Sequence, residues 1–348
     1  MSGSTENKAI LLTGAAGFIG SYLAEEFLRA YPERRVIGYD VLAYCASKEN
    51  LADAMDNKRF VFVRGDICDA ACLQRTLETY DVGMIVHCAA ESHVDNSFGN
   101  SLHFTDVNVR GTHNLLECAR TWHMQGRLER FLHVSTDEVY GTTDEGDLHH
   151  EGSLLNPTNP YSASKAAAEM YARAYLTSYN MPIVVTRSNN IFGPRQHPEK
   201  VIPRFVQRVL HGNLPQIDGT GEQERTFLYV TDVARAISTV LKDGVIGETY
   251  NIGCNTKLTI GELAEKVVAF AKRLHGKSFA SAWEFSGTDR PFNDLRYRLD
   301  WSKIRGLGWR PTVGFDLGLE RIFAWHSKKN MRRNHWNDSQ WACMVEDA

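Results

Sequence analysis

Apolar runs alternate with helical stretches along the first half of the chain, and this alternation limits the possible folds more than any other feature. The runs are continuous rather than alternating in polarity, as expected for strands that are covered on both faces. They recur from residue 8 to 190 as "KAILLT", "RVIGYD", "RFVFVRGD", "GMIVHCAA", "RFLHVSTD" and "PIVVTRSN". Segments with helical spacing, beginning with "FIGSYLAEEFLRAY", separate them. The sequence therefore predicts an α/β fold built on a doubly wound parallel sheet.

The pattern changes from about residue 191, where Gly, Pro and charged residues become denser. "YVTDVARAISTVL" again has helical spacing and "ETYNIG" is strand-like. We therefore expect residues 1–190 to form the sheet domain and the chain to return to it at about 229–254. A smaller, mostly α-helical domain at 191–228 and 255–330 is expected to bind the substrate. A C-terminal tail follows at 331–348, and its two tryptophans favour packing.

Composition excludes several classes of protein. The 39 basic and 42 acidic side chains form no basic block suited to nucleic acid, and no apolar run reaches the ~18 residues of a membrane span. The start, "MSGSTENK", lacks an apolar leader, so a cytoplasmic protein is expected. Seven cysteines without a CxxC pair argue for reduced thiols and against a metal site.

A glycine-rich segment, "TGAAGFIG", follows the first strand and opens the first helix. Its glycines allow a tight turn and close approach of the backbone to a pyrophosphate, which the helix N-terminus favours. The spacing is GxxGxxG rather than GxGxxG, and a simple turn is the alternative. In this context it predicts a Rossmann-type dinucleotide site, with the expected contacts Gly14, Gly17, Phe18, Ile19 and Gly20.

Two acids follow the next strands. Asp40 ends the second strand, where a carboxylate accepts both hydroxyls of an adenosine ribose and repels the extra phosphate of NADP, so NAD is the expected cofactor. Asp66, next to Ile67 after the third strand, is placed to read the adenine amino group. A solvated or turn-forming Asp is the alternative for both.

Tyr161 and Lys165 lie four residues apart at the start of an Ala-rich helix and share a face. An ammonium beside a phenol stabilises the phenolate, so Tyr161 is a candidate base that takes a proton from a sugar hydroxyl. A second candidate site is "VSTDEVYG", where Asp137 and Glu138 end an apolar strand. Burial of a carboxylate pair costs free energy, so the pair serves either as a helix cap or in chemistry.

The motifs and their order resemble the nucleotide-sugar 4,6-dehydratases of the extended short-chain dehydrogenase/reductase superfamily, from about residue 8 to 326. The resemblance is carried by "TGAAGFIG", "DVLAYCASKENL", "GDICD", "HCAAESHVDNSF", "VSTDEVYG", "NPYSASKAAAE", "RSNNIFGPRQHPEKVIPRF", "RTFLYVTDVARAI", "YNIG" and "DRPFNDLRYRLD". It implies a hydro-lyase with tightly bound NAD, to which Tyr161 and Lys165 also contribute contacts.

The same resemblance implies the roles of the residues. After oxidation at C4 of the sugar, Glu138 takes the C5 proton, Asp137 protonates the departing C6 oxygen, and Thr136 helps hold the 4-hydroxyl near Tyr161. Asp137 must then be protonated when substrate is bound, so burial and the neighbouring charge are expected to raise its pKa. The expected substrate contacts are Ser92, Asn190, Lys200, Arg225, Arg290 and Asn293. For Lys200, Arg225 and Arg290, a solvated basic face is the alternative.

The segments "DRPFND" and "HVDNSF" are similar to the UDP-glucose branch of these enzymes. The expected reaction is therefore conversion of UDP-glucose to UDP-4-keto-6-deoxyglucose for deoxysugar synthesis, such as a route to rhamnose, by a homodimer. dTDP-glucose is the alternative substrate, since one methyl and one hydroxyl distinguish the two. A UDP-sugar 4-epimerase or UDP-glucuronate decarboxylase needs no Asp137–Glu138 pair. A non-catalytic protein on this fold has no reason to keep all five catalytic residues.

Overall fold

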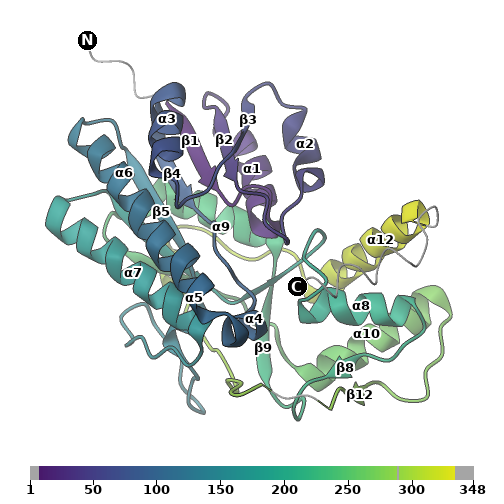
Figure 1. Ribbon diagram of the computed structural model, residues 1–348. Helices are drawn as coiled ribbons and strands as arrows, with labels where there is room; N and C mark the ends of the chain where they lie inside the picture. The colour runs from purple at the N-terminus through teal and green to yellow at the C-terminus, as the bar shows by residue number, and fades with distance from the viewer. Residues whose placement is uncertain (1–7, 288–289, 334–348) are drawn as a thin grey trace.

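The computed structural model describes residues 8–287 and 290–333. Its main element is a seven-stranded sheet, ordered β10-β6-β5-β4-β1-β2-β3, in which every neighbouring pair is parallel (Figure 1). The strands are β1 (Ala9–Thr13), β2 (Val36–Asp40), β3 (Phe60–Arg64), β4 (Val82–His87), β5 (Arg130–Thr136), β6 (Ile183–Ser188) and β10 (Thr249–Ile252). The predicted doubly wound parallel sheet is confirmed.

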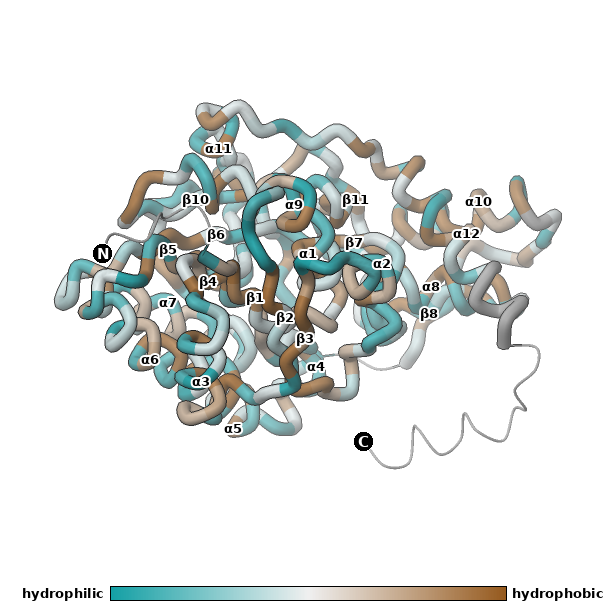
Figure 2. Tube along the Cα trace, turned by 90° about the horizontal axis from the view of Figure 1, so that it is seen from above, coloured by the Kyte–Doolittle hydropathy of each residue, from teal (hydrophilic) through white to brown (hydrophobic). Residues whose placement is uncertain are grey.

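Helices cover both faces of this sheet. α1 (Phe18–Ala30) and α9 (Val230–Asp243) pack together on one face, and α3 (Ala70–Tyr80), α6 (Thr112–Met124) and α7 (Pro160–Tyr179) lie on the other. Each layer has its own apolar core, to which Phe27 of α1 and Leu116 of α6 contribute fully buried side chains. Apolar residues concentrate along β1, β2 and β3 in the interior (Figure 2). This burial on both faces explains the continuous apolar runs in the sequence.

The helical stretch from Ser101 to Met124 is divided into three segments. α5 (Ser101–Phe104) is followed by a π-helical segment, η3 (Thr105–Gly111), and then by α6. The wider turn carries the buried Asn108, whose amide contacts the backbone of Glu91 and the Ser164 hydroxyl. The segment thus links the loop after β4 to α7.

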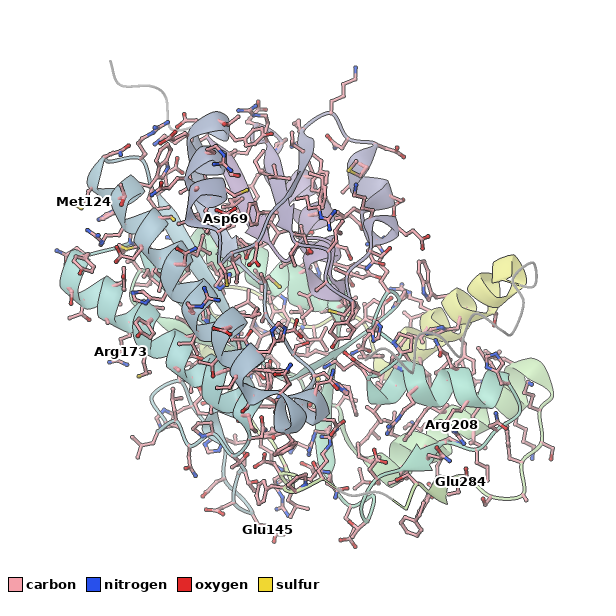
Figure 3. The ribbon with its side chains drawn as sticks, viewed as in Figure 1. Asp69, Met124, Glu145, Arg173, Arg208 and Glu284 are labelled. Carbon is pink, nitrogen blue, oxygen red and sulfur yellow. The ribbon has the colours of Figure 1, made fainter. Side chains whose placement is uncertain are left out.

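The remaining elements pack around a third apolar core beside the sheet. A small sheet holds β11 (Lys257–Thr259), β9 (Glu224–Tyr229) and β7 (Asn190–Phe192), and a second pairs β12 (Glu284–Phe285) with β8 (Gln216–Ile217). The helices of this region are α8 (Val201–Leu210), α10 (Ile260–His275) and α12 (Phe315–Arg333). Arg208 of α8 pairs with Glu284 of β12 at 3.0 Å (Figure 3).

Shorter elements complete the chain: η2 (Lys48–Leu51), α2 (Ala52–Met55), α4 (Val94–Gly99), η4 (Asp137–Tyr140) and α11 (Ser302–Gly306). The proposed division into two domains near residues 190, 228 and 254 stays a prediction. Residues 334–348 of the expected tail, with both of its tryptophans, lie outside the described residues. Within residues 8–287 and 290–333, no helix is long and apolar enough to cross a membrane.

Candidate active site

The glycine-rich segment forms a tight turn between β1 and α1. Gly14 has φ +71°, and a Cβ there would lie 2.7 Å from the backbone nitrogen of Ala89. A Cβ on Gly20 would lie 1.9 Å from the carbonyl oxygen of Gly14. These two positions therefore exclude any larger residue, and the turn brings bare backbone to the end of the sheet, where a pyrophosphate can approach.

Asp40 lies at the end of β2 beside this turn and is 6% exposed. Its carboxylate accepts hydrogen bonds from the Ala16 N–H at 2.9 Å and the Leu42 N–H at 2.7 Å. Burial raises its pKa, and the two backbone donors oppose the rise. Asp40 therefore fixes the glycine-rich turn as well as facing the cavity that the turn borders.

A cavity of about 500 Å³ extends from the glycine-rich turn to the ends of β5 and β6. Sixteen of the residues expected at the site line it: Gly14, Gly17, Phe18, Ile19, Gly20, Asp40, Asp66, Ile67, Ser92, Thr136, Asp137, Glu138, Tyr161, Lys165, Asn190 and Lys200. A second cavity of about 160 Å³ shares Ser92, Glu138, Asn190 and Lys200 with the first, and adds Arg225, Arg290 and Asn293. The structure therefore brings all of the expected site residues to two connected cavities.

The two carboxylates follow β5 directly, in the short helix η4. Thr136 caps this helix by accepting from the Glu138 N–H, and its hydroxyl also lies 3.2 Å from Asp137 Oδ1. Asp137 is 2% exposed, whereas Glu138 is half-buried and accepts a hydrogen bond from Asn159 Nδ2 at 3.2 Å. The capping role is thus performed by Thr136, which leaves both acids directed to the cavities.

Burial is the main influence on the two acids. It raises the pKa of Asp137 to about 7, with a further increase from Glu138, while Asn189, Thr136 and Arg225 oppose the rise. Burial also raises the pKa of Glu138, against hydrogen bonding from Asn159 and the charge of Arg225. Asp137 therefore holds a proton near neutral pH more readily than an ordinary Asp, as expected from its surroundings.

Tyr161 and Lys165 project from the first two turns of α7. Asn159 caps this helix in a reciprocal capping box with Ser162, and Pro160 occupies its first turn. The Lys165 ammonium donates to the Val134 carbonyl at 2.8 Å, and burial lowers its pKa to about 8. The pKa of Tyr161 is raised by burial and then by Glu138, so stabilisation of its phenolate by Lys165 stays a prediction.

The three expected cations border the second cavity, and each already has protein partners. Lys200 Nζ donates to the Ser92 carbonyl at 2.6 Å, and Arg225 Nη2 donates to Asn293 Oδ1 at 2.9 Å. Arg225 also lies over the ring of Tyr297, 4.8 Å from its centroid. Arg290 pairs with Asp95. Lysines and arginines at one cavity suit a dianion such as a nucleoside diphosphate.

Sequence reasoning did not single out two amides that touch the carboxylate pair. Asn159 binds Glu138, and Asn189 donates from Nδ2 to Asp137 Oδ2 at 2.7 Å. The strand register contains a signal for the contact between Asn189 and Asp137. Thr136 pairs with Ser188 on the neighbouring parallel strand, so the residues that follow them, Asp137 and Asn189, lie next to each other.

Comparison with known proteins agrees with this geometry. The family model for GDP-mannose 4,6 dehydratase matches residues 11–322. The chain belongs to this family. Its resemblance to the nucleotide-sugar 4,6-dehydratases is thereby confirmed. The dTDP-D-glucose 4,6-dehydratase of Bos taurus is 42% identical to this family member over 333 residues, which cover 96% of this chain and 92% of the bovine protein.

Two further relatives match this chain over most of its length. The trifunctional UDP-glucose 4,6-dehydratase/UDP-4-keto-6-deoxy-D-glucose 3,5-epimerase/UDP-4-keto-L-rhamnose-reductase of Arabidopsis thaliana is 43% identical over 92% of this chain but only 47% of its own length. The crystal structure of DesIV, the dTDP-glucose 4,6-dehydratase of Streptomyces venezuelae with NAD and TYD bound, has a TM-score of 0.86. It is 41% identical and covers 94% of this chain and 99% of DesIV.

Proposed function

We propose that the protein is an NAD-dependent nucleotide-sugar 4,6-dehydratase, a hydro-lyase. The observation that carries the proposal is the convergence of Asp137, Glu138 and Tyr161 on one cavity that begins at the glycine-rich turn. A buried acid with a raised pKa beside a second carboxylate provides the acid and the base that elimination of water requires.

The residues around the first cavity fit NAD. Gly14 and Gly20 leave no room for a Cβ, and Asp40 presents a buried carboxylate at the end of β2. Gly17, Phe18, Ile19, Asp66 and Ile67 would complete the dinucleotide site. NAD, when bound, supplies the chemistry of accepting hydride from C4 of the sugar and returning it to C6. DesIV, with its bound NAD, supports this assignment.

The chain's own residues provide the proton transfers. Tyr161 takes the proton of the 4-hydroxyl as C4 is oxidised to a ketone, and Thr136 holds that oxygen. Glu138 then removes the C5 proton, which the new ketone makes acidic. The C5–H electron pair forms the C5=C6 double bond, the C6–O bond breaks, and Asp137 gives its proton to the oxygen that leaves as water. Asp137 ends this step as a carboxylate.

The comparisons support dTDP-glucose as substrate better than the UDP-glucose expected from the sequence. The bovine relative and DesIV both carry dTDP-glucose in their names and match over nearly their whole length. We therefore propose dTDP-glucose first. UDP-glucose is the second candidate, because the plant relative has similar identity and because the segment around Phe292 and Asn293 resembles that branch.

We further propose that the protein acts in the cytoplasm as a homodimer and that its 4-keto-6-deoxy product supplies deoxysugar synthesis. Apolar side chains on α5, α6 and α7 are exposed, including Leu102 at 79% and Met124 at 73%. Figure 3 shows Met124 at the outer end of α6. We propose that this side of the molecule faces the partner subunit.

Incubation with dTDP-glucose and with UDP-glucose in separate reactions in D₂O tests the proposal by mass spectrometry. We expect an accepted sugar to lose one water and to carry deuterium at C5, and the faster substrate identifies the branch to which the enzyme belongs. Asp137→Asn is expected to keep deuterium exchange at C5 and lose elimination, whereas Glu138→Gln is expected to lose both. Failure of the wild-type protein to release water from either sugar would refute the dehydratase proposal, and inversion at C4 alone would indicate an epimerase.

A further inference from the structure

The buried amide of Asn189 is placed against one oxygen of the proposed general acid. Its Nδ2 lies 2.7 Å from Asp137 Oδ2 and 3.4 Å from the carbonyl oxygen of Tyr297. Asn189 is 3% exposed and Asp137 is 2% exposed, so water does not compete freely for this contact. A hydrogen bond to a buried carboxylate is among the stronger ones in proteins.

Three strands fix the position of this amide. The residues before Asn189 and Asp137, Ser188 and Thr136, are register partners on β6 and β5. The Asn189 N–H donates to the Ile252 carbonyl of β10 at 3.1 Å. A Cβ on Gly253 would lie 3.0 Å from Asn189 Oδ1, so the glycine leaves space for the carboxamide. The amide is therefore held by rigid strand ends rather than by a loop.

We infer that Asn189 is a positioning residue for Asp137, which orients its carboxyl group and stabilises the carboxylate that remains after Asp137 has protonated the leaving C6 oxygen. The inference rests on the proposed dehydratase function. Asn189 donates to the oxygen Oδ2, while the Thr136 hydroxyl contacts Oδ1. Negative charge develops on Asp137 only as water leaves, so a fixed donor stabilises the transition state of that step.

The groups around Asp137 determine how Asn189 affects its protonation. Thr136 and Glu138 face it from its own segment, Asn189 from the end of β6, Tyr161 from α7 and Arg225 from β9. Burial and Glu138 favour the protonated acid, whereas Asn189 favours the carboxylate. Loss of the amide must therefore raise the pKa of Asp137 further and make the acid a weaker proton donor.

Asn189→Leu replaces the amide by an apolar side chain of similar size, and Asn189→Ser keeps a donor. In Asn189→Leu we expect elimination to slow about 10- to 100-fold, as for loss of one hydrogen bond to a charged group. Deuterium exchange at C5 is expected to persist, and the alkaline limb of the pH–rate profile to move to higher pH. Compared with Asn189→Leu, the Asn189→Ser variant is expected to recover part of the elimination rate, and its alkaline limb is expected to lie closer to that of the wild-type protein.

A matched control is Thr186→Val, which alters the same strand. Thr186 is 1% exposed, and its hydroxyl has no hydrogen-bond partner among the described residues. This variant is expected to leave both the elimination rate and the alkaline limb unchanged. If Asn189→Leu slows elimination but leaves the alkaline limb of the pH–rate profile in place, the amide serves packing alone. This result would overturn the inference.

A second measurement does not depend on turnover. Titration of the Asp137 carboxyl carbon by NMR, assigned with Asp137→Asn, is expected to show a higher pKa in Asn189→Leu than in the wild-type protein. An unchanged pKa would overturn the inference even in an active enzyme. A shifted pKa in a protein that dehydrates no sugar would instead support the Asn189 contact and refute the proposed function.

Discussion

The guanidinium of Arg290 is paired with the carboxylate of Asp95, with Nε 2.5 Å from Oδ1 and Nη2 3.0 Å from Oδ2. Asp95 belongs to α4, which follows β4 of the main sheet, and Arg290 belongs to the segment before Asp294, so the pair joins the two sides of the second cavity. A cation expected to hold the substrate diphosphate therefore already has an anionic partner, with which the diphosphate must compete.

Changes at this pair are expected to have opposite effects on nucleotide affinity. Arg290→Ala removes a charged donor and is expected to weaken binding of the nucleoside diphosphate about 10-fold or more. Asp95→Asn removes the competitor and is expected to strengthen binding by roughly two- to fivefold, the range of a partly exposed ion pair. Calorimetric titration measures both. Arg173→Ala, on the outer side of α7 (Figure 3), controls for net charge, and weaker binding in Asp95→Asn would contradict the competition.

Asp40 is expected to determine the choice between NAD and NADP. Asp40→Asn lowers the negative charge beside the expected ribose, so the preference for NAD over NADP should fall about tenfold or more. The amide also keeps only one acceptor for the Ala16 and Leu42 N–H groups, so the melting temperature should decrease. Parallel affinity measurements for the two dinucleotides test this, and an unchanged affinity ratio would show that Asp40 serves only the turn.

Tyr161→Phe is expected to stop the reaction before elimination. Loss of the phenol removes the base for the 4-hydroxyl, and turnover should fall by about 10²- to 10⁴-fold. Because the C5 proton becomes acidic only after oxidation at C4, exchange at C5 should be lost as well. This outcome differs from that of Asp137→Asn, which keeps exchange. Rapid exchange at C5 in Tyr161→Phe would show that another group starts the reaction.

The raised pKa of Asp137 predicts that the folded protein becomes less stable as the pH increases. Its pKa rises from 3.8 to about 7 on folding, chiefly through burial and then through Glu138. The folded protein thus binds this proton more tightly than the unfolded chain, and the associated stability is present below about pH 4 and lost as the pH rises to about 7. Asp137→Asn should therefore raise the melting temperature more at pH 8 than at pH 5. An equal gain at both pH values would contradict a raised pKa.

The same proton predicts an alkaline limit to activity. Elimination requires protonated Asp137, so kcat should fall as the pH increases above about 7. Glu138 must be ionised, and its raised pKa places the acidic limit above that of an ordinary Glu. A pH–rate profile with no alkaline limb near this value, in a range where the protein stays folded, would argue against Asp137 as the acid.

Strands and site residues were predictable from the sequence where the physical signal is local. The continuous apolar runs predicted six of the seven strands of the main sheet, because burial on both faces demands them, and the strand-like segment "ETYNIG" predicted the seventh, β10. Gly14 and Gly20 were predictable because no side chain fits at either position. Asp137 and Glu138 stood out because acids at the end of a buried strand are costly.

Contacts between distant segments were not predictable in the same way. The partners of Lys165 and Asp137, the Val134 carbonyl and Asn189, depend on how strands and helices are registered. The π-helical turn at Asn108 gives no periodic signal over so short a stretch. The small sheets around β9 and β8 were missed because four of their five strands are only two or three residues long.

The last strand to join the seven-stranded sheet, β10, comes from residues 249–252, after the chain has already built β7 to β9 elsewhere. During synthesis on the ribosome, the edge beside β6 therefore stays open until about 60 more residues have emerged, at roughly 5 to 20 residues per second. Asn189, whose backbone binds β10, gains that anchor only then. The acid site is thus completed only with the last strand of the main sheet, and a nascent chain truncated before β10 would carry Asp137 and Glu138 without this support.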